Sequence, residues 1–199
     1  ETVFFPISIK DALEIIIEQD ANAAPITFTS SGLAINGDPS DNLCFKAYGL
    51  LKKDYPTIPN IKMHLHKTIP MGAGLGGGSA DGAFTLVALN QLFNLQLSVD
   101  KLMQYALTLG SDCPFFIINT PAFASGRGEI LKPINVNLDG YRIVIVNPGI
   151  AISTKLAFSL ITPNVPDTNL ETIICEPVTS WKDLLINDFE EPIFNSFPE

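Results

Sequence analysis

The sequence predicts an α+β fold made of two domains. Strand-like and helix-like patterns are mixed along the chain, a glycine-rich stretch near residue 75 joins a strand pattern to a helix pattern, and the composition changes beyond residue 148. At 199 residues the chain is long enough to bury a full core. We therefore predict a first domain over residues 1–148 and the beginning of a second domain over residues 149–199.

Six segments before residue 67 have strand or helix patterns. They are a strand over Thr2–Ile9, a strand or a helix over Asp11–Glu18, a strand pair over Ala24–Ser30 and Gly32–Ile35, a helix that Asp41 caps and that ends before Pro56, and a strand over Ile61–His66. Apolar and polar residues alternate in the last strand, so His64 and His66 are expected on the surface. As an i, i+2 pair they could also ligate a metal, but no third ligand is apparent.

Strand and helix patterns stay mixed in the rest of the chain. They are a helix that Ser79 caps, a helix from Ser98 to Gly110, strands over Phe115–Ile118, Ala122–Ser125 and Tyr141–Asn147, and helical or mixed pieces over Ile152–Leu160 and Trp181–Ile186. The run Tyr141–Asn147 is expected to be buried on both faces, because its apolar residues are continuous. A proline and a glycine break this run, and Thr162–Asn169 is predicted to be a turn-rich connector.

The charge balance argues against two classes of partner. Twelve Lys and Arg residues against 21 Asp and Glu residues give a net charge of −9, which disfavours nucleic acid and anionic membrane surfaces. No apolar run reaches 18 residues, so no membrane helix is predicted. Cys44, Cys113 and Cys175 lack metal-ligand spacing, and we interpret them as reduced thiols of a cytoplasmic protein.

The densest run of glycines lies between Pro70 and Gly82, where six glycines occur. Glycine adopts positive φ angles and lets a ligand approach the backbone, at a cost in chain entropy. The run leads into a helix pattern, and the start of a helix presents free N–H groups and about half a positive charge. The sequence therefore predicts that this loop binds phosphate.

Three other interpretations of the glycine run fit the sequence less well. Gly72, Gly74 and Gly77 match the dinucleotide-binding pattern G-x-G-x-x-G, but the helix that follows leads into a second helix pattern instead of a strand with an acidic tip. A Walker loop requires a lysine before its Ser or Thr, whereas Gly78 precedes Ser79. A flexible linker rarely contains large apolar residues or continues directly into an apolar helix.

The residues Pro70, Gly74, Leu75 and Ser79 supply the pattern Pro-x-x-x-Gly-Leu-x-x-x-Ser. This pattern resembles the phosphate loop of the GHMP kinases, and the likeness extends over residues 40–160. The resemblance implies a GHMP-kinase-like two-domain fold. Its N-terminal domain would resemble domain 2 of ribosomal protein S5, here without its first strand, and the chain would only begin its ferredoxin-like C-terminal domain.

The finer form of the loop is similar to that of the GHMP kinases that phosphorylate a cytidine-diphosphate-linked methylerythritol in non-mevalonate isoprenoid biosynthesis. The resemblance implies ATP and Mg²⁺ as cofactors and CDP-methylerythritol as the small-molecule substrate, with neither nucleic acid nor membrane as partner. It also implies a lysine near the active site, on a strand ahead of residue 1. Two alternatives stay open: another small-alcohol kinase of the superfamily, and a nucleotide-binding sensor without turnover.

The resemblance assigns a role to each matching residue. Those that would hold the ATP phosphates are Pro70, Gly72, Gly74, Leu75, Gly76, Gly77, Gly78 and Ser79, with Ser79 also reaching Mg²⁺; those beside the nucleotide would be Asn42, Leu43 and Lys67; and Phe158 would stack on the cytosine. Five of these residues have a structural alternative: an N-cap for Ser79, a helix start for Asn42, core packing for Leu43 and Phe158, and a solvated charge for Lys67.

Asp112 is the predicted catalytic base and a predicted substrate-binding residue. It lies in Gly-Ser-Asp-Cys-Pro at a predicted helix end, where loop backbone can direct a side chain into a cleft. In the kinases that this chain resembles, the matching Asp accepts the proton of the acceptor hydroxyl, which is the role of a general base. The structural alternative is an Asx turn or a cap before Pro114.

Overall fold

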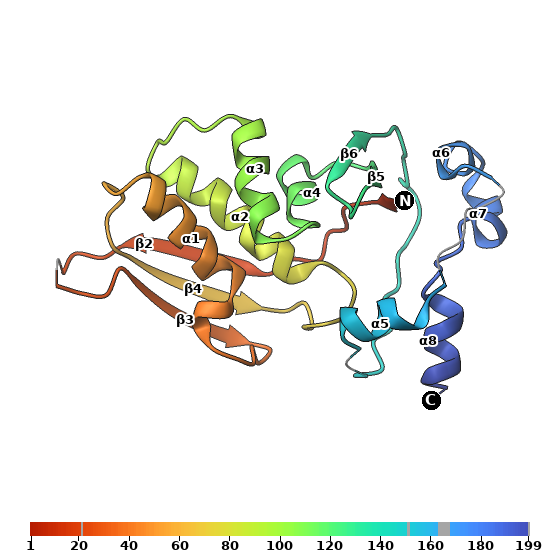
Figure 1. Ribbon diagram of the computed structural model, residues 1–199, viewed down its shortest axis with the longest axis horizontal. Coiled ribbons are helices and arrows are strands. Elements are labelled where there is room, and N and C mark those ends of the chain that lie inside the picture. The colour runs from red at the N-terminus through yellow and green to blue at the C-terminus, as the bar shows by residue number, and fades with distance from the viewer. Residues whose placement is uncertain (21, 151, 163–167, 199) are drawn as a thin grey trace.

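The computed structural model describes residues 1–20, 22–150, 152–162 and 168–198. A three-stranded sheet carries helices on one face, a smaller sheet lies beside it, and short helices follow (Figure 1). The strands are β1 (Thr2–Phe4), β2 (Ala12–Ile17), β3 (Ile26–Gly32), β4 (Ile61–Lys67), β5 (Ala122–Ser125) and β6 (Ile130–Pro133). The helices are α1 (Leu43–Asp54), α2 (Gly77–Leu92), α3 (Val99–Leu109), α4 (Cys113–Ile118), α5 (Thr154–Leu160), α6 (Leu170–Ile173), α7 (Val178–Leu184) and α8 (Glu190–Ser196). This mixture confirms the predicted α+β class.

The larger sheet has the strand order β2-β4-β3, with β4 antiparallel to β2 and parallel to β3. Ile61, Met63 and Leu65 of β4 are at most 1% exposed and belong to one core cluster with residues of α1, α2 and α3. The alternation continues to the end of the strand, so that Lys67 also lies on the buried face. The central strand therefore carries a cation into the region beneath the helices.

His64 and His66 lie on the opposite face of this sheet, as predicted. Ser31 Oγ lies 2.8 Å from His64 Nε2 and 2.9 Å from His66 Nδ1, and Thr29 Oγ1 lies 2.8 Å from His64 Nδ1. Within the described ranges, His, Cys, Asp and Glu side chains form no group of three that could hold a metal ion. The two histidines are thus part of a polar ladder between β3 and β4.

The smaller sheet has the order β1-β5-β6 and is antiparallel throughout. Its strand β1 is joined to α4 by an aromatic contact, because the ring centroids of Phe4 and Phe115 lie 5.0 Å apart. Phe115 in turn packs edge to face against Phe116 at 5.1 Å. These contacts fix the start of the chain against the helix that follows Asp112.

Two strands predicted from short apolar runs are wrong. Phe115–Ile118 belongs to α4, since Pro114 near its start has a φ that favours a first helical turn. Periodicity over so few residues does not separate a buried strand from a buried helix. Gly32–Ile35 forms no second strand of a pair, because β3 ends at Gly32, where a φ of +79° turns the chain.

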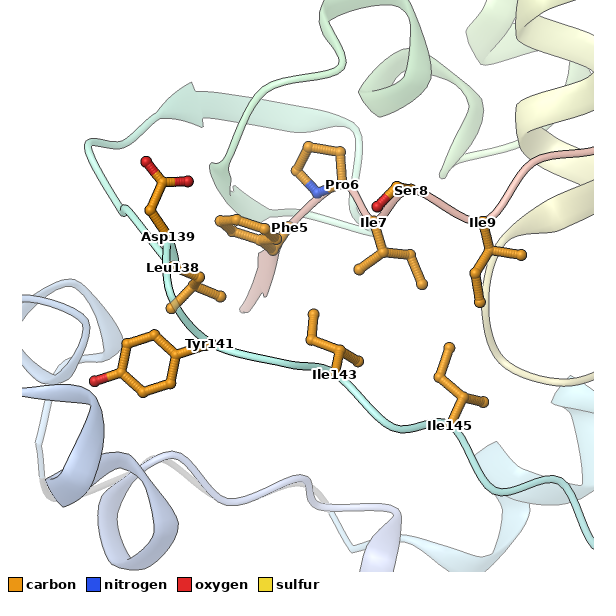
Figure 2. A pocket seen from close by; sticks show the side chains of 10 residues that line it. All are labelled: Phe5, Pro6, Ile7, Ser8, Ile9, Leu138, Asp139, Tyr141, Ile143 and Ile145. Carbon is orange, nitrogen blue, oxygen red and sulfur yellow. The ribbon is translucent and has the colours of Figure 1, made fainter.

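The segment Tyr141–Asn147 is also not a strand, and the prediction that both its faces are buried is wrong. Val144 and Val146 are 83% and 84% exposed. Among the described residues no strand pairs with this segment, which runs as a coil. Figure 2 shows that Ile143 and Ile145 lie opposite the segment Phe5–Ile9, with which they line a cavity of about 280 Å³.

Two predicted helix caps are wrong by one or more residues. Asn42 instead of Asp41 caps α1, and its Oδ1 accepts the N–H of Cys44 at 2.9 Å. Asp41 ends the short 3₁₀ turn that precedes α1. Helix α2 begins at Gly77, so that Ser79 is its third residue and not its N-cap.

The other predicted elements are confirmed, although several are shorter than expected. The ambiguous run after Asp11 is the strand β2, Ser98 caps α3, and the C-terminal pieces are helical in α5 and α7. The predicted connector Thr162–Asn169 includes residues 163–167, which lie outside the described part of the chain. Of the helices that the structure describes, none has the length and apolar character needed to cross a membrane.

Replacing Gly82 by alanine is expected to destabilise the protein by about 1–3 kcal/mol, because the added methyl would overpack the contact between α2 and α1. A Cβ at this position would lie 2.8 Å from Leu43 Cβ. The matched control is Gly49→Ala in α1, where a Cβ would meet nothing within 4 Å and where alanine should stabilise the helix by about 1 kcal/mol. Urea unfolding measures both variants. Similar stabilisation by both substitutions would contradict the close packing at Gly82.

Candidate active site

The glycine-rich loop leads from β4 to α2 and contains three left-handed glycines. Gly72, Gly74 and Gly76 have φ angles of +71°, +71° and +66°, which residues with a Cβ rarely adopt. A Cβ on Gly72 or Gly74 would meet nothing within 4 Å, so this part of the loop borders open space. Backbone of this kind can present consecutive N–H groups as an anion-binding concavity.

Helix α2 begins directly at the end of this loop. Its first internal hydrogen bond runs from the Ala80 N–H to the Gly76 carbonyl at 2.8 Å, so the N–H groups of Gly77, Gly78 and Ser79 have no acceptor within the helix. No side chain of the described residues caps this end. A 16-residue helix also directs its positive dipole end here, which favours a bound anion.

Asp112 directly precedes α4 and lines the groove beside this loop. The turn between β5 and β6 lies against it, since a Cβ on Gly128 would be 3.3 Å from Asp112 Oδ1. Desolvation by the surrounding protein raises the pKa of this carboxyl above its ordinary value. A carboxylate with a raised pKa is a stronger proton acceptor, as a general base requires.

One groove of about 780 Å³ joins the loop to this carboxylate. Gly74–Gly77 form part of its lining, together with the rings of Phe4, Phe84 and Phe115. Its charged lining side chains are Lys10, Asp11, Asp81 and Asp112. The structure therefore brings Gly74–Gly77 of the predicted phosphate loop and the predicted base to one groove with apolar walls, whereas Pro70, Gly72, Gly78 and Ser79 lie outside its lining.

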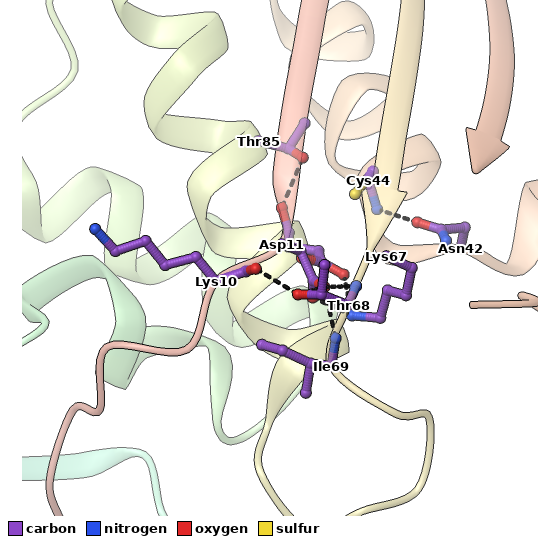
Figure 3. Close-up of polar contacts among 9 residues, drawn as sticks. Lys10, Asp11, Asn42, Cys44, Lys67, Thr68, Ile69 and Thr85 are labelled. Atoms are coloured by element: carbon purple, nitrogen blue, oxygen red, sulfur yellow. Dashed lines mark hydrogen bonds and ion pairs between the residues drawn. The ribbon is translucent and has the colours of Figure 1, made fainter. Parts of the chain in front are cut away.

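A buried ionic cluster lies where β4 ends and the glycine-rich loop begins (Figure 3). The Lys67 ammonium, in a side chain that is 1% exposed, donates to Asp11 Oδ2 and to Asp81 Oδ2, the latter at 2.7 Å. Asp11 Oδ1 also accepts the backbone N–H groups of Thr68 at 2.6 Å and Ile69 at 2.9 Å. Two carboxylates thus share one ammonium, and all three groups are shielded from water.

The pKa values of the two carboxylates of this cluster are shifted in opposite directions. Burial raises the pKa of Asp81 to about 6, although the Lys67 ammonium opposes the shift. Burial also acts on Asp11, but hydrogen bonds from Lys67 and from the N–H groups of Ile69 and Thr68 outweigh it and lower the pKa of Asp11. Asp81 accepts hydrogen bonds from fewer donors than Asp11 does, which explains why the pKa of Asp81 is raised.

The residues predicted beside the nucleotide lie away from the groove lining. Asn42 and Leu43 begin α1, and a Cβ on Gly82 would meet Leu43, which is consistent with the packing alternative for that leucine. Lys67 is not the solvated charge of our alternative prediction, because its ammonium is buried and bonded to two carboxylates. None of the three lines the 780 Å³ groove, and their contact with a nucleotide stays a prediction.

Phe158 also lies outside the lining of this groove. It belongs to α5, is 60% exposed and packs edge to face against Phe189, with ring centroids 5.0 Å apart. The alternative of core packing is therefore wrong for this residue, because most of its side chain contacts solvent. Stacking of Phe158 on a cytosine stays a prediction.

Sequence reasoning missed the partners of Lys67 and the cation at the groove. Asp11 and Asp81 were not among the predicted site residues, nor was Lys10, whose side chain points away from Asp11 and Lys67 (Figure 3). The alternation of β4 could have revealed part of this, because it places Lys67 on the buried face, where an ammonium requires carboxylate partners.

The variant Asp81→Asn should gain stability relative to the wild type as pH rises from 4 to 7. The folded-state pKa of Asp81, about 6, exceeds its ordinary value of 3.8, so the folded protein binds this proton more tightly than the unfolded chain does. The stability that this carboxyl contributes is present below about pH 4 and is lost as pH rises through about 6. Urea unfolding at both pH values measures the difference. A difference that is constant, or that changes in the other direction, would show that Lys67 keeps Asp81 ionised in the folded state.

Comparisons with known proteins agree with this geometry. The family described as "GHMP kinases N terminal domain" matches residues 42–126, which include the glycine loop, α2, α4 and Asp112. A solved structure, "Crystal structure of 4-(cytidine 5'-diphospho)-2C-methyl-D-erythritol kinase", superposes with a TM-score of 0.70 at 29% identity, over 98% of this chain and 68% of that one. The predicted GHMP-kinase fold is confirmed.

Curated relatives are more similar in sequence to this chain than the solved structure is. The 4-diphosphocytidyl-2-C-methyl-D-erythritol kinase of Bacteroides fragilis strain YCH46 is 49% identical over 198 residues, and that of Bacteroides thetaiotaomicron is 48% identical. Each alignment covers 100% of this chain and 72% of the relative. Identity at this level, together with the shared fold and the phosphate loop, shows that the chain belongs to the 4-diphosphocytidyl-2-C-methyl-D-erythritol kinase family of the GHMP kinases.

Proposed function

We propose that this protein transfers the γ-phosphoryl group of ATP to the 2-hydroxyl of 4-diphosphocytidyl-2-C-methyl-D-erythritol, a step in non-mevalonate isoprenoid biosynthesis. The relatives named above are kinases of this compound. The observation that carries the proposal is the groove that joins an uncapped helix start to a desolvated carboxylate. Phosphoryl transfer requires a phosphate cradle and a proton acceptor within reach of one substrate pair.

The residues at the loop fit the phosphates of ATP. The N–H groups of Gly77, Gly78 and Ser79 have no acceptor within the helix. The neighbouring Gly72 and Gly74 leave open space where side chains would otherwise project. Phosphate oxygens would accept these N–H groups, and the dipole of α2 would stabilise their negative charge. This arrangement would hold the nucleotide without a Walker lysine.

In the proposed reaction, Asp112 accepts the proton of the acceptor hydroxyl. The hydroxyl oxygen then bonds to the γ-phosphorus, the bond from that phosphorus to the β,γ-bridging oxygen breaks, and ADP leaves. The raised pKa of Asp112 favours proton uptake during this step. The apolar rings of Phe4 and Phe115 line the same groove and would limit the access of water, which could otherwise accept the phosphoryl group.

We propose magnesium as the metal ion that acts with ATP at this site. Ser79 is partly exposed in the first turn of α2, and its hydroxyl is the protein oxygen that we propose to hold Mg²⁺ together with phosphate oxygens. When bound, the ion would neutralise charge that develops on the phosphates. We also propose that the protein acts on small molecules in the cytoplasm, which suits its net charge of −9 and the free thiols of Cys44, Cys113 and Cys175.

The variant Asp112→Asn should lose between 10²- and 10⁴-fold in kcat, because it keeps the shape of the side chain but removes the proton acceptor. ADP release with the CDP-linked methylerythritol as acceptor measures the effect. Asp100→Asn, which changes an exposed carboxylate on α3 in the same way, is the control and should retain wild-type turnover. Turnover of Asp112→Asn within tenfold of the wild type would rule out this base.

The same assay separates the proposal from its alternatives. Mevalonate, homoserine and galactose replace the CDP-linked acceptor in parallel reactions. Faster ADP release with one of these acceptors would indicate another small-alcohol kinase of the superfamily. ATP binding without ADP release for any acceptor would indicate a nucleotide sensor.

A further inference from the structure

The ionic cluster at the start of the glycine-rich loop holds both ends of that loop. On the strand side, Asp11 Oδ1 accepts the N–H groups of Thr68 and Ile69, the first two residues after β4, at 2.6 and 2.9 Å. On the helix side, the Lys67 ammonium donates to Asp81 Oδ2 at 2.7 Å, and Asp81 is the fifth residue of α2. The same ammonium donates to Asp11. One cation thus connects the start of the loop to the helix that ends it.

The first helical residue shows how closely this cluster approaches the site. A Cβ on Gly77 would lie 3.1 Å from Lys67 Nζ and 2.9 Å from Ile69 Cγ2. Glycine at this position therefore lets the ammonium lie directly against the helix start. The N–H groups without an acceptor in the helix belong to Gly77 and the two residues after it. The position of the ammonium therefore affects the direction in which these N–H groups point.

We propose that Asp81 is a positioning residue for the phosphate loop, which acts through Lys67 and Asp11 to hold the first turn of α2 in its phosphate-binding orientation. The inference rests on the proposed function of the loop as the ATP phosphate site. Asp81 does not donate to phosphate, since an ionised carboxylate only accepts hydrogen bonds. Its effect on ATP is carried by the backbone that it holds in place.

The sign of the effect separates positioning from electrostatics. Asp81 carries a negative charge near a site for a polyanion, so that removing the charge should by Coulomb's law tighten ATP binding. If Asp81 positions the helix start, its removal should weaken binding despite this gain. Opposite signs allow one measurement of affinity to decide between the two effects.

The main variant is Asp81→Ala, which removes the link between Lys67 and α2. Lys67 and Asp11 remain as a neutral pair, so the variant leaves no unbalanced buried charge and is expected to fold. We expect its Kd for ATP, with Mg²⁺ in excess and no acceptor, to rise at least tenfold. Its kcat at saturating ATP should stay within about threefold of the wild type, because the base and the acceptor are untouched.

Two further variants test whether the effect is specific. Asp81→Asn keeps an oxygen that can accept the Lys67 ammonium, and it should restore the Kd for ATP to within about threefold of the wild type. Asp54→Ala is the matched control, because Asp54 Oδ2 accepts the Tyr105 hydroxyl at 2.6 Å and so links α1 to α3 away from the loop. This control should lower the melting temperature without a change in ATP affinity.

Hydrogen exchange in the absence of nucleotide tests the same inference independently of ATP. Peptides that contain residues 68–80 should exchange faster in Asp81→Ala than in the wild type, while peptides of α3 should not change. Unchanged exchange over residues 68–80, or an ATP affinity that is unchanged or tighter, would overturn the positioning role. A wild-type protein that fails to bind ATP would instead contradict the proposed function, and exchange over residues 68–80 would still decide the positioning role.

Discussion

The start of α2 has N–H groups that its own helix cannot use, and the rest of the site depends on this constraint. A helix end needs partners for its first N–H groups, which side-chain caps usually provide. Here Gly76 occupies the N-cap position with a left-handed φ, and among the described residues no side chain caps the end. The unfilled donors, the helix dipole and the open space above the glycines all favour the same ligand, a phosphate group.

The position of this helix end is set by a cluster of side chains that are at most 9% exposed. β4 is the central strand of its sheet and brings Lys67 to the start of the loop, where Asp11 and Asp81 neutralise it. Burial of three ionisable groups costs desolvation free energy, and such clusters often add little to stability. Because such a cluster adds little stability, we explain its presence by the geometry that it imposes on both ends of the binding loop.

Much of the fold and part of the site could be predicted from the sequence. The glycine run, the strand before it and the helix after it were predicted from local composition, because glycine preference and apolar periodicity are properties of single segments. Asp112 was predicted through its motif, and the structure places it on the same groove as Gly74–Gly77. Long periodic segments and the glycine run were therefore predicted reliably, whereas short apolar runs and single cap positions were not.

The remaining features depend on contacts between distant segments. Asp11 and Asp81 become partners of Lys67 only after β2, β4 and α2 pack together, so no local sequence pattern identifies them. Tyr141–Asn147 has the composition of a buried strand, but a strand also requires a neighbour, and the described residues supply none. Lys67 is an intermediate case, since the period of β4 indicates its burial but not the identity of its partners.

The central claim is that the backbone N–H groups at the start of α2 bind the phosphates of ATP. Titration of ¹⁵N-labelled protein with ATP tests it most directly, because amide chemical shifts report on each N–H group. The account predicts that the largest shifts occur at Gly72–Ala80, with Gly77 and Gly78 among them. Shifts that are absent from this loop and instead concentrate on the outer face of the sheet, around Thr29 and His64, would contradict it.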